Sequence, residues 1–254
     1  LGYDEIVLMD YARSTLLEAR EQIARRFPER RRAFRLVAAD VYALPFAGGL
    51  FDAATMVRVL HHVADVPAAL AGIAAILKPG ATFVLEFANK RNLKAILRYL
   101  ARRQAWSPFA PEPVEFARLN FDFHPAWLEA RWRAAGFSVK KTLAVSHFRW
   151  APLKRLLPAR TLAALDGAVQ GVGALCKLSP SLFELLQAPA ANRPAPPGTF
   201  FRCPACRGET HPAIATTSSK PGRTRTMRKV LMSGLRGETP RIRHMHNYMG
   251  ASGH

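Results

Sequence analysis

Apolar and polar positions alternate along the first three quarters of the chain in two different patterns. Continuous apolar runs are typical of strands that are covered on both faces, and apolar residues three or four apart indicate helices that pack by one face. The expected strands are residues 6–9, 34–39, 53–59, 82–87, 137–148 and 181–186. The expected helices are residues 14–27, 67–77, 92–104, 125–135, 153–157 and 160–175. Strands that alternate with helices predict an α/β fold with a parallel sheet covered on both faces.

The pattern changes near residue 188. Residues 189–202 are rich in Pro and Ala and read as a linker. Residues 203–254 are polar, basic and without periodicity, so an irregular or disordered tail is expected there. The sequence therefore predicts one domain over residues 1–188, followed by the linker and the tail.

Composition narrows the class of protein. Apolar residues make up 49% of 254, enough for a sizeable core. No run of about 18 uncharged apolar residues occurs, because the nearest one, Thr161 to Cys176, contains Asp166. A membrane span is therefore not expected. Three cysteines, two of them in one CxxC pair, argue against a disulfide framework and indicate a reducing cytoplasm.

The net charge is +19, and residues 189–254 hold 11 Lys and Arg against 2 Asp and Glu. Such a balance favours contact with nucleic acid or anionic membrane. The same arginines also suit solvated helix faces, so both interpretations stay open.

The stretch from Asp40 to Glu86 is the most informative. An acidic residue follows an apolar strand and precedes a Leu-Pro-Phe sequence, and Phe-Asp then opens a second apolar strand. Leu-His-His, a helix and Lys-Pro-Gly follow before a third apolar run. This order resembles the middle of a class I S-adenosylmethionine (SAM) dependent methyltransferase. The resemblance is to the methyltransferase type 11 group, which includes the ubiquinone and menaquinone biosynthesis enzymes, and it extends over residues 1–188.

The resemblance implies a Rossmann-like sheet of order 3-2-1-4-5-7-6, SAM as cofactor and a small-molecule methyl acceptor. It assigns Asp10 to the ribose hydroxyls of SAM and Tyr11 to a position against the adenine or ribose. It assigns Asp40 to the adenine amino group and the backbone of Val41 to the ring. Each carboxylate also has a local interpretation, since Asp10 can cap the helix that follows and Asp40 can start a turn.

Two further residues are assigned to the methionine half of SAM. Val57 and Arg58 end the strand that the family places fourth, where the cofactor and the acceptor meet. Arg58 can pair with a carboxylate of SAM or of the substrate, or it can simply face solvent.

The resemblance also exposes a gap. The family carries a GxGxG-like loop after its first strand, where only glycine allows close backbone approach to the cofactor. Gly48, Gly49, Gly171 and Gly173 stand in other contexts. We therefore expect an amino-terminally truncated chain that lacks the first strand, leaves a hole in the middle of the sheet and binds SAM weakly or not at all.

No catalytic residue is assigned, because in-line alignment supplies most of methyl transfer. Neighbouring His61 and His62 are expected to point apart by about 100° on a helical turn and so to chelate poorly. Several side chains could line an acceptor pocket without any motif that singles one out: Tyr99, Trp106, Glu115, Asp122, His124 and His147.

Cys203 and Cys206 resemble one knuckle of a zinc ribbon. A structural zinc site needs four ligands and no second CxxC exists, so bound zinc is not expected. The function predicted from the sequence is thus methyl transfer from SAM to a small molecule, impaired in a truncated chain. The alternative is a non-catalytic or nucleic-acid-binding relative that uses its basic surfaces.

Overall fold

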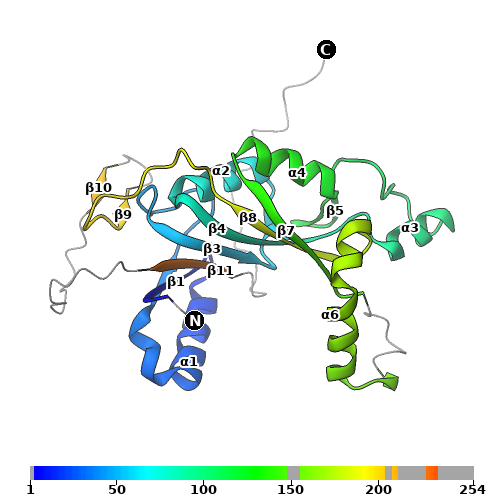
Figure 1. The fold of residues 1–254 in the computed structure, drawn as a ribbon, viewed down its shortest axis with the longest axis horizontal. Coiled ribbons are helices and arrows are strands. Elements are labelled where there is room, and N and C mark those ends of the chain that lie inside the picture. Colours follow the sequence, from blue (N-terminus) through cyan, green and yellow to red (C-terminus); the bar gives the residue numbers. More distant parts are fainter. Residues whose placement is uncertain (1–2, 148–154, 204–207, 211–226, 234–254) are drawn as a thin grey trace, which may run out of the picture.

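A seven-stranded sheet forms the centre of the protein (Figure 1). This computed structural model describes residues 3–147, 155–203, 208–210 and 227–233. The strand order is β2-β1-β11-β3-β4-β8-β7, and β8 runs antiparallel to both of its neighbours while the other adjacent pairs are parallel. The strands are β1 (Glu5–Asp10), β2 (Phe34–Ala38), β3 (Phe51–Val57), β4 (Leu77–Ala88), β7 (Ser138–Val145), β8 (Ser181–Gln187) and β11 (Arg228–Ser233).

Helices lie on both faces of this sheet, which confirms the predicted fold class (Figure 1). One face is covered by α2 and α4, and α1 and α6 lie on the other. The helices are α1 (Arg13–Arg26), α2 (Val66–Ile76), α3 (Leu93–Leu100), α4 (Pro125–Ala134) and α6 (Ala159–Cys176). Two 3-10 turns, η1 (Pro28–Ala33) and η2 (Leu60–His62), and two hairpins, β5 (Val114–Ala117) with β6 (Asn120–Asp122) and β9 (Phe201–Arg202) with β10 (Glu209–Thr210), complete the fold.

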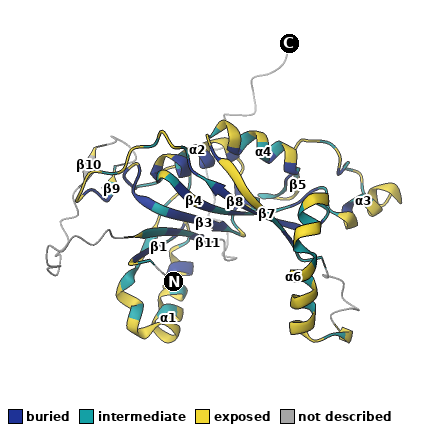
Figure 2. Cartoon of the chain, in the orientation of Figure 1, coloured by how far each residue is buried: buried dark blue, intermediate teal, exposed yellow. Residues whose placement is uncertain are grey.

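The core lies between the sheet and the α2–α4 layer. Phe51, Phe83, Phe87 and Trp132 are among its largest fully buried side chains. Figure 2 shows the strands largely buried, whereas α1, α3 and α6 expose most of their surface. No residue of α6 is buried, although the helix is mostly apolar. The two helix layers are therefore unequal, and one of them leaves apolar surface in water.

The middle of the sheet is not as the sequence predicted. The expected hole is filled by β11, which pairs in parallel with β1 on one side and with β3 on the other. The tail is thus not irregular throughout, since residues 228–233 are a central strand. The strand order therefore matches the order 3-2-1-4-5-7-6 expected for the family, and β11 takes the place of the first strand.

Side-chain alternation and two acidic residues hold β11 in place. Val230 is fully buried in the core and Met232 nearly so. The guanidinium Nε of Arg228 donates to Glu5 Oε2 at 2.7 Å, and the Arg228 backbone N–H donates to Asp52 Oδ2 at 2.9 Å. Only Val230 to Met232 are apolar in this otherwise polar and basic strand, and so short a run gives no clear strand signal.

The Pro/Ala-rich segment packs on the domain. Asn192 Nδ2 donates to the carbonyls of Ala74 and Leu77 at 2.7 and 2.8 Å, where α2 ends. Phe200 is buried and its ring lies edge-on to Phe46. The residue bounds of the domain, the linker and the tail remain predictions.

Candidate functional site

The carboxyl ends of five parallel strands meet at one edge of the sheet. Met232 pairs with Met9 of β1 and with Met56 of β3, so the last residues of the three strands lie level. Asp10 and Ala38 are also paired, which brings the end of β2 to the same level. Ligands of open α/β sheets bind outside this edge, and we take it as the candidate site.

Asp10 and Asp40 follow neighbouring strands at this edge. Asp10 is buried, and its Oδ1 accepts a hydrogen bond from the Ala12 N–H at 2.7 Å. Asp40 is exposed, and its Oδ1 accepts from the Tyr42 N–H at 2.9 Å. The local interactions that the sequence left open are therefore present in both cases. Each of them orients a carboxylate beside the edge.

The other predicted cofactor contacts lie on both sides of β11. Tyr11 is exposed beside Asp10, and Val41 packs against the core after β2. Val57 ends β3, and its Cα pairs with that of Ser233. The structure thus places Val57 two strands away from Asp10, with β11 between them.

Arg58 adopts a left-handed backbone conformation, with φ of 60°. A non-glycine residue held at positive φ is strained. Its N–H donates to Glu86 Oε2 at 2.8 Å, and the hydroxyl of Ser181 donates to the other oxygen of Glu86. Glu86 therefore holds the turn after β3 and ties it to the start of β8. Glu86 was not predicted from the sequence, although it is an acid near the end of an apolar strand, the signal that singled out Asp10 and Asp40.

His61 and His62 are closer than the sequence predicted. Their ring centroids lie 3.9 Å apart with an interplanar angle of 47°, so the expected divergence is wrong for this 3-10 turn. The Nδ1 of His62 hydrogen-bonds the carbonyl oxygen of Leu119 at 2.9 Å. This bond attaches the β5–β6 hairpin to the turn beside the edge.

The pKa of His61 is lowered, chiefly by burial, and further by the neighbouring His62 and Arg58, while the carboxylate of Glu86 opposes the shift. The imidazole is therefore neutral at pH 7. A His pKa that is lower in the folded state favours folding above its ordinary value of 6.5, and this stabilisation is lost as the pH falls through the folded-state pKa.

Replacing Glu86 by Gln should lower the pKa of His61 further, because it removes the negative charge that supports the imidazolium. The measurement is a pH titration of the His61 ring by NMR in both proteins. Glu18→Gln on α1 is the matched control and should leave the His61 titration unchanged. A higher His61 pKa in Glu86→Gln would contradict the arrangement.

Three of the predicted acceptor-pocket residues have partners on other elements, and their role in an acceptor pocket remains a prediction. Burial raises the pKa of Asp122, and the positive charge of Arg98 partly offsets this shift. The ring of Tyr99 packs on that of Phe109. The ring of His147 bonds Asp166 of α6 at 2.9 Å. Val145 at the end of β7 and Ala88 at the end of β4 both pair with Ser181, so His147 follows a strand that ends at the same edge.

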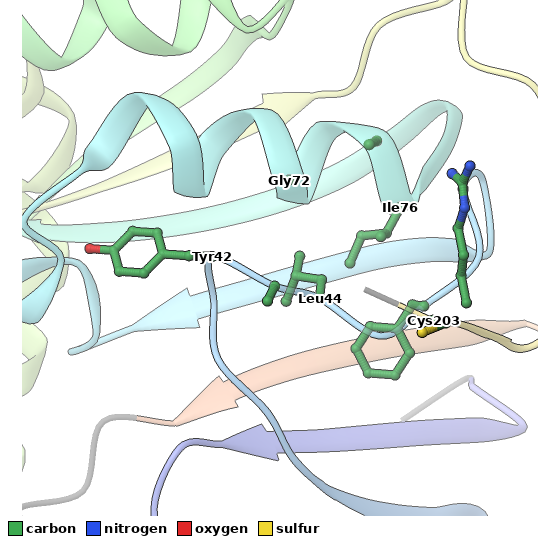
Figure 3. A pocket seen from close by; sticks show the side chains of 10 residues that line it. Tyr42, Leu44, Gly72, Ile76 and Cys203 are labelled. Atoms are coloured by element: carbon green, nitrogen blue, oxygen red, sulfur yellow. The ribbon is translucent and has the colours of Figure 1, made fainter. Parts of the chain in front are cut away.

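Two cavities lie away from this edge. One, of about 210 Å³, lies beneath α2, with Leu44 and Ile76 in its wall and Cys203 at one end (Figure 3). The other, of about 390 Å³, lies at the opposite edge of the sheet beside Asp52 and Lys78. The predicted cofactor residues line neither cavity.

The zinc-ribbon-like motif is only partly described. The Cys203 N–H donates to the Gly208 carbonyl at 2.9 Å and closes the β9–β10 hairpin, whereas Cys206 lies outside the described residues. Within the described ranges, no group of three or more His, Cys, Asp or Glu side chains could hold a metal ion. In the same ranges, no helix is long and apolar enough to cross a bilayer.

Comparison with known proteins gives the family. Residues 1–85 match the methyltransferase domain family. The chain is 31% identical over 134 residues to a 2-phytyl-1,4-naphtoquinone methyltransferase of Nostoc punctiforme, covering 43% of this chain and 57% of that protein. It is 33% identical over 154 residues to a demethylmenaquinone methyltransferase of Thermus thermophilus, covering 55% and 66%. Residues 1–85 therefore carry the methyltransferase domain, and the matches support a class I SAM-dependent methyltransferase family for the chain.

A solved structure supports the fold of this chain. The crystal structure of the [4+2]-cyclase SpnF superposes with a TM-score of 0.50 at 18% identity, covering 75% of this chain and 78% of that one. The predicted family and fold are confirmed. The chain spans less than two thirds of the length of the two curated relatives it matches. Asp10, Asp40 and Arg58 all lie within the matched residues 1–85.

Proposed function

We propose that the protein binds SAM at the carboxyl edge of its sheet and transfers the methyl group to a small-molecule acceptor. The observation that carries the proposal is the pair of carboxylates at the ends of adjacent parallel strands, buried Asp10 and exposed Asp40. Two acceptors at the ends of adjacent strands suit the two donor groups of an adenosyl moiety, the ribose hydroxyls and the adenine amino group.

The local hydrogen bonds favour this use of the carboxylates. The backbone N–H of Ala12 bonds Asp10, and that of Tyr42 bonds Asp40, so both side chains are oriented before a ligand arrives. In this arrangement Asp10 takes the ribose, and Asp40 with the backbone of Val41 takes the adenine. The methionine half then extends toward Val57 and Arg58.

SAM supplies a sulfonium-activated methyl group when it is bound. The protein then has to align the acceptor and remove a proton where the acceptor is a hydroxyl or a carbon acid. His61 is neutral at pH 7, and Glu86 stabilises its protonated form, so this pair can hold such a proton.

The names of the two relatives point to the acceptor class. One acts on a phytyl-bearing naphtoquinone and the other on demethylmenaquinone, as their names state. We extend this to the present chain as a proposal, in which the acceptor is a naphthoquinone-type ring with an apolar side chain.

Asp10→Ala tests the cofactor site. The chain has no GxGxG loop, so we expect weak binding of SAM, with a dissociation constant on the order of 100 μM. Loss of charge-assisted hydrogen bonds to the ribose should weaken it by at least tenfold. Isothermal titration with SAM measures both values, and Glu21→Ala on α1 serves as the exposed acidic control. Equal affinities for Asp10→Ala and the parent chain would refute the proposed site.

A further inference from the structure

The outward face of α3 is apolar although it lies in water. Leu93, Leu97 and Leu100 recur at the spacing of one helix face, and they are 52%, 57% and 67% exposed. The helix packs on the protein by Ala95, its buried residue. A contiguous apolar stripe of this kind on a soluble surface marks an interaction site.

Basic side chains border the stripe. Lys94, Arg102 and Arg103 are exposed, and within the described residues no ion pair involves them. The sequence contains no acidic residue from Asn89 to Pro111. Every charged residue in this stretch is therefore basic, and Asp122 of β6, whose pKa is raised by burial, lies near Arg98.

An aromatic side chain and a second helix extend the apolar surface. Phe109 is half-exposed and lies edge-on to Tyr99 of α3, with ring centroids 6.2 Å apart. The Leu93 N–H donates to the Leu178 carbonyl at 2.9 Å, so α3 begins where α6 has just ended. Leu175 in the last turn of α6 is the most exposed large apolar residue described, and Figure 2 shows exposed surface on both helices.

We propose that this α3 face docks on an anionic lipid bilayer. Apolar residues on one stripe, Lys and Arg at its border and an aromatic side chain beside it are what a helix needs to lie in a membrane interface. A second copy of the chain fits less well, because two such faces would bring like charges together. Nucleic acid would use the basic residues but would leave the three leucines in water.

The position of α3 links docking to the candidate site. The helix begins at Leu93, five residues after β4 ends at the carboxyl edge. A bilayer in contact with α3 would thus lie beside the edge, where an acceptor with an apolar chain could pass between membrane and protein. This consequence rests on the proposed function, whereas docking itself does not.

Vesicle flotation of the full chain, with no SAM present, tests the docking. The probes are vesicles of phosphatidylcholine alone and of phosphatidylcholine with about 30 mol% phosphatidylglycerol. We expect the chain to float with the anionic vesicles and to be released by salt. Replacing Leu93, Leu97 and Leu100 by Gln should weaken binding at least about tenfold. Lys94→Gln, Arg102→Gln and Arg103→Gln should each weaken it about fivefold at low salt.

A variant on α1 is the matched control, since it removes an exposed leucine and basic charges from a different surface. Leu17 is 43% exposed, and Leu17→Gln with Arg25→Gln and Arg26→Gln should float as the parent chain does. If the triple Leu variant loses its circular-dichroism signal, the single Leu97→Gln variant replaces it, with an expected loss of about threefold in binding.

Flotation unchanged by the α3 variants would place binding elsewhere and overturn the proposal. Absence of flotation, leucine-dependent self-association without vesicles, or binding to RNA alone would overturn it too. A chain that floats but does not bind SAM would refute the proposed function and leave the docking intact.

Discussion

Val230→Asp should lower the free energy of unfolding by more than about 4 kcal/mol, because it places an unpaired carboxylate in the core. Val230 is fully buried and packs in the same cluster as Val7, Ala54 and Met56. Its strand is hydrogen-bonded on both sides, so the substitution cannot be relieved by moving one edge of the sheet. Since a domain of this size is stable by only about 5–15 kcal/mol, much of the sheet should open. Urea unfolding followed by circular dichroism measures the loss.

Val172→Asp is the matched control, since Val172 on α6 is 66% exposed. It should change the free energy of unfolding by less than about 0.5 kcal/mol. A Val230→Asp protein as stable as this control would mean that β11 is not part of the sheet in solution.

Asn89→Ala should cost about 3 kcal/mol or more, because one buried side chain makes three hydrogen bonds. Asn89 is 1% exposed, and its Nδ2 donates to the carbonyls of Lys177 and Ser179 at 2.7 and 2.8 Å. Its Oδ1 accepts from the Arg91 N–H at 2.9 Å. The residue therefore joins the end of β4 to the segment between α6 and β8. Thermal and urea unfolding of the variant check the magnitude.

Asn92→Ala provides a comparison from the same segment. Asn92 Oδ1 accepts from the Ala95 N–H at 2.9 Å and caps α3. Loss of an N-cap costs about 1 kcal/mol, so this variant should be clearly more stable than Asn89→Ala. The reverse order would show that the buried Asn89 bonds contribute little.

The sequence predicted most elements because their signals are local. Ile6 to Met9 is an uninterrupted apolar run and Thr82 to Phe87 is a mostly apolar one, and both lie in strands of the sheet. The helix that begins near Val66 carries Pro67 in its first turn and an N-cap, Asp65, whose Oδ1 accepts from the Ala68 N–H at 3.0 Å. Such features need only a few residues to be recognised.

Relations between distant residues were beyond the sequence. The pairing of residues 228–233 with β1 and β3 joins segments more than 170 residues apart, and no local pattern encodes the partner. The bond from the Arg58 N–H to Glu86 likewise depends on the alignment of β3 with β4. The α3 helix was expected from its composition, but which of its faces points to water was not. The structure places Asp10 and Asp40 at the ends of adjacent strands. Their roles in binding SAM remain predictions.

The late position of β11 in the chain has a consequence for biosynthesis. β1 and β3 leave the ribosome early, but the strand that joins them is made only after residue 227. At about 5–20 residues per second, the two halves of the nascent sheet wait on the order of ten seconds with facing edges unpaired. Unpaired edges of this kind recruit other chains, so the protein should depend on chaperones during its synthesis more than a family member whose central strand emerges first.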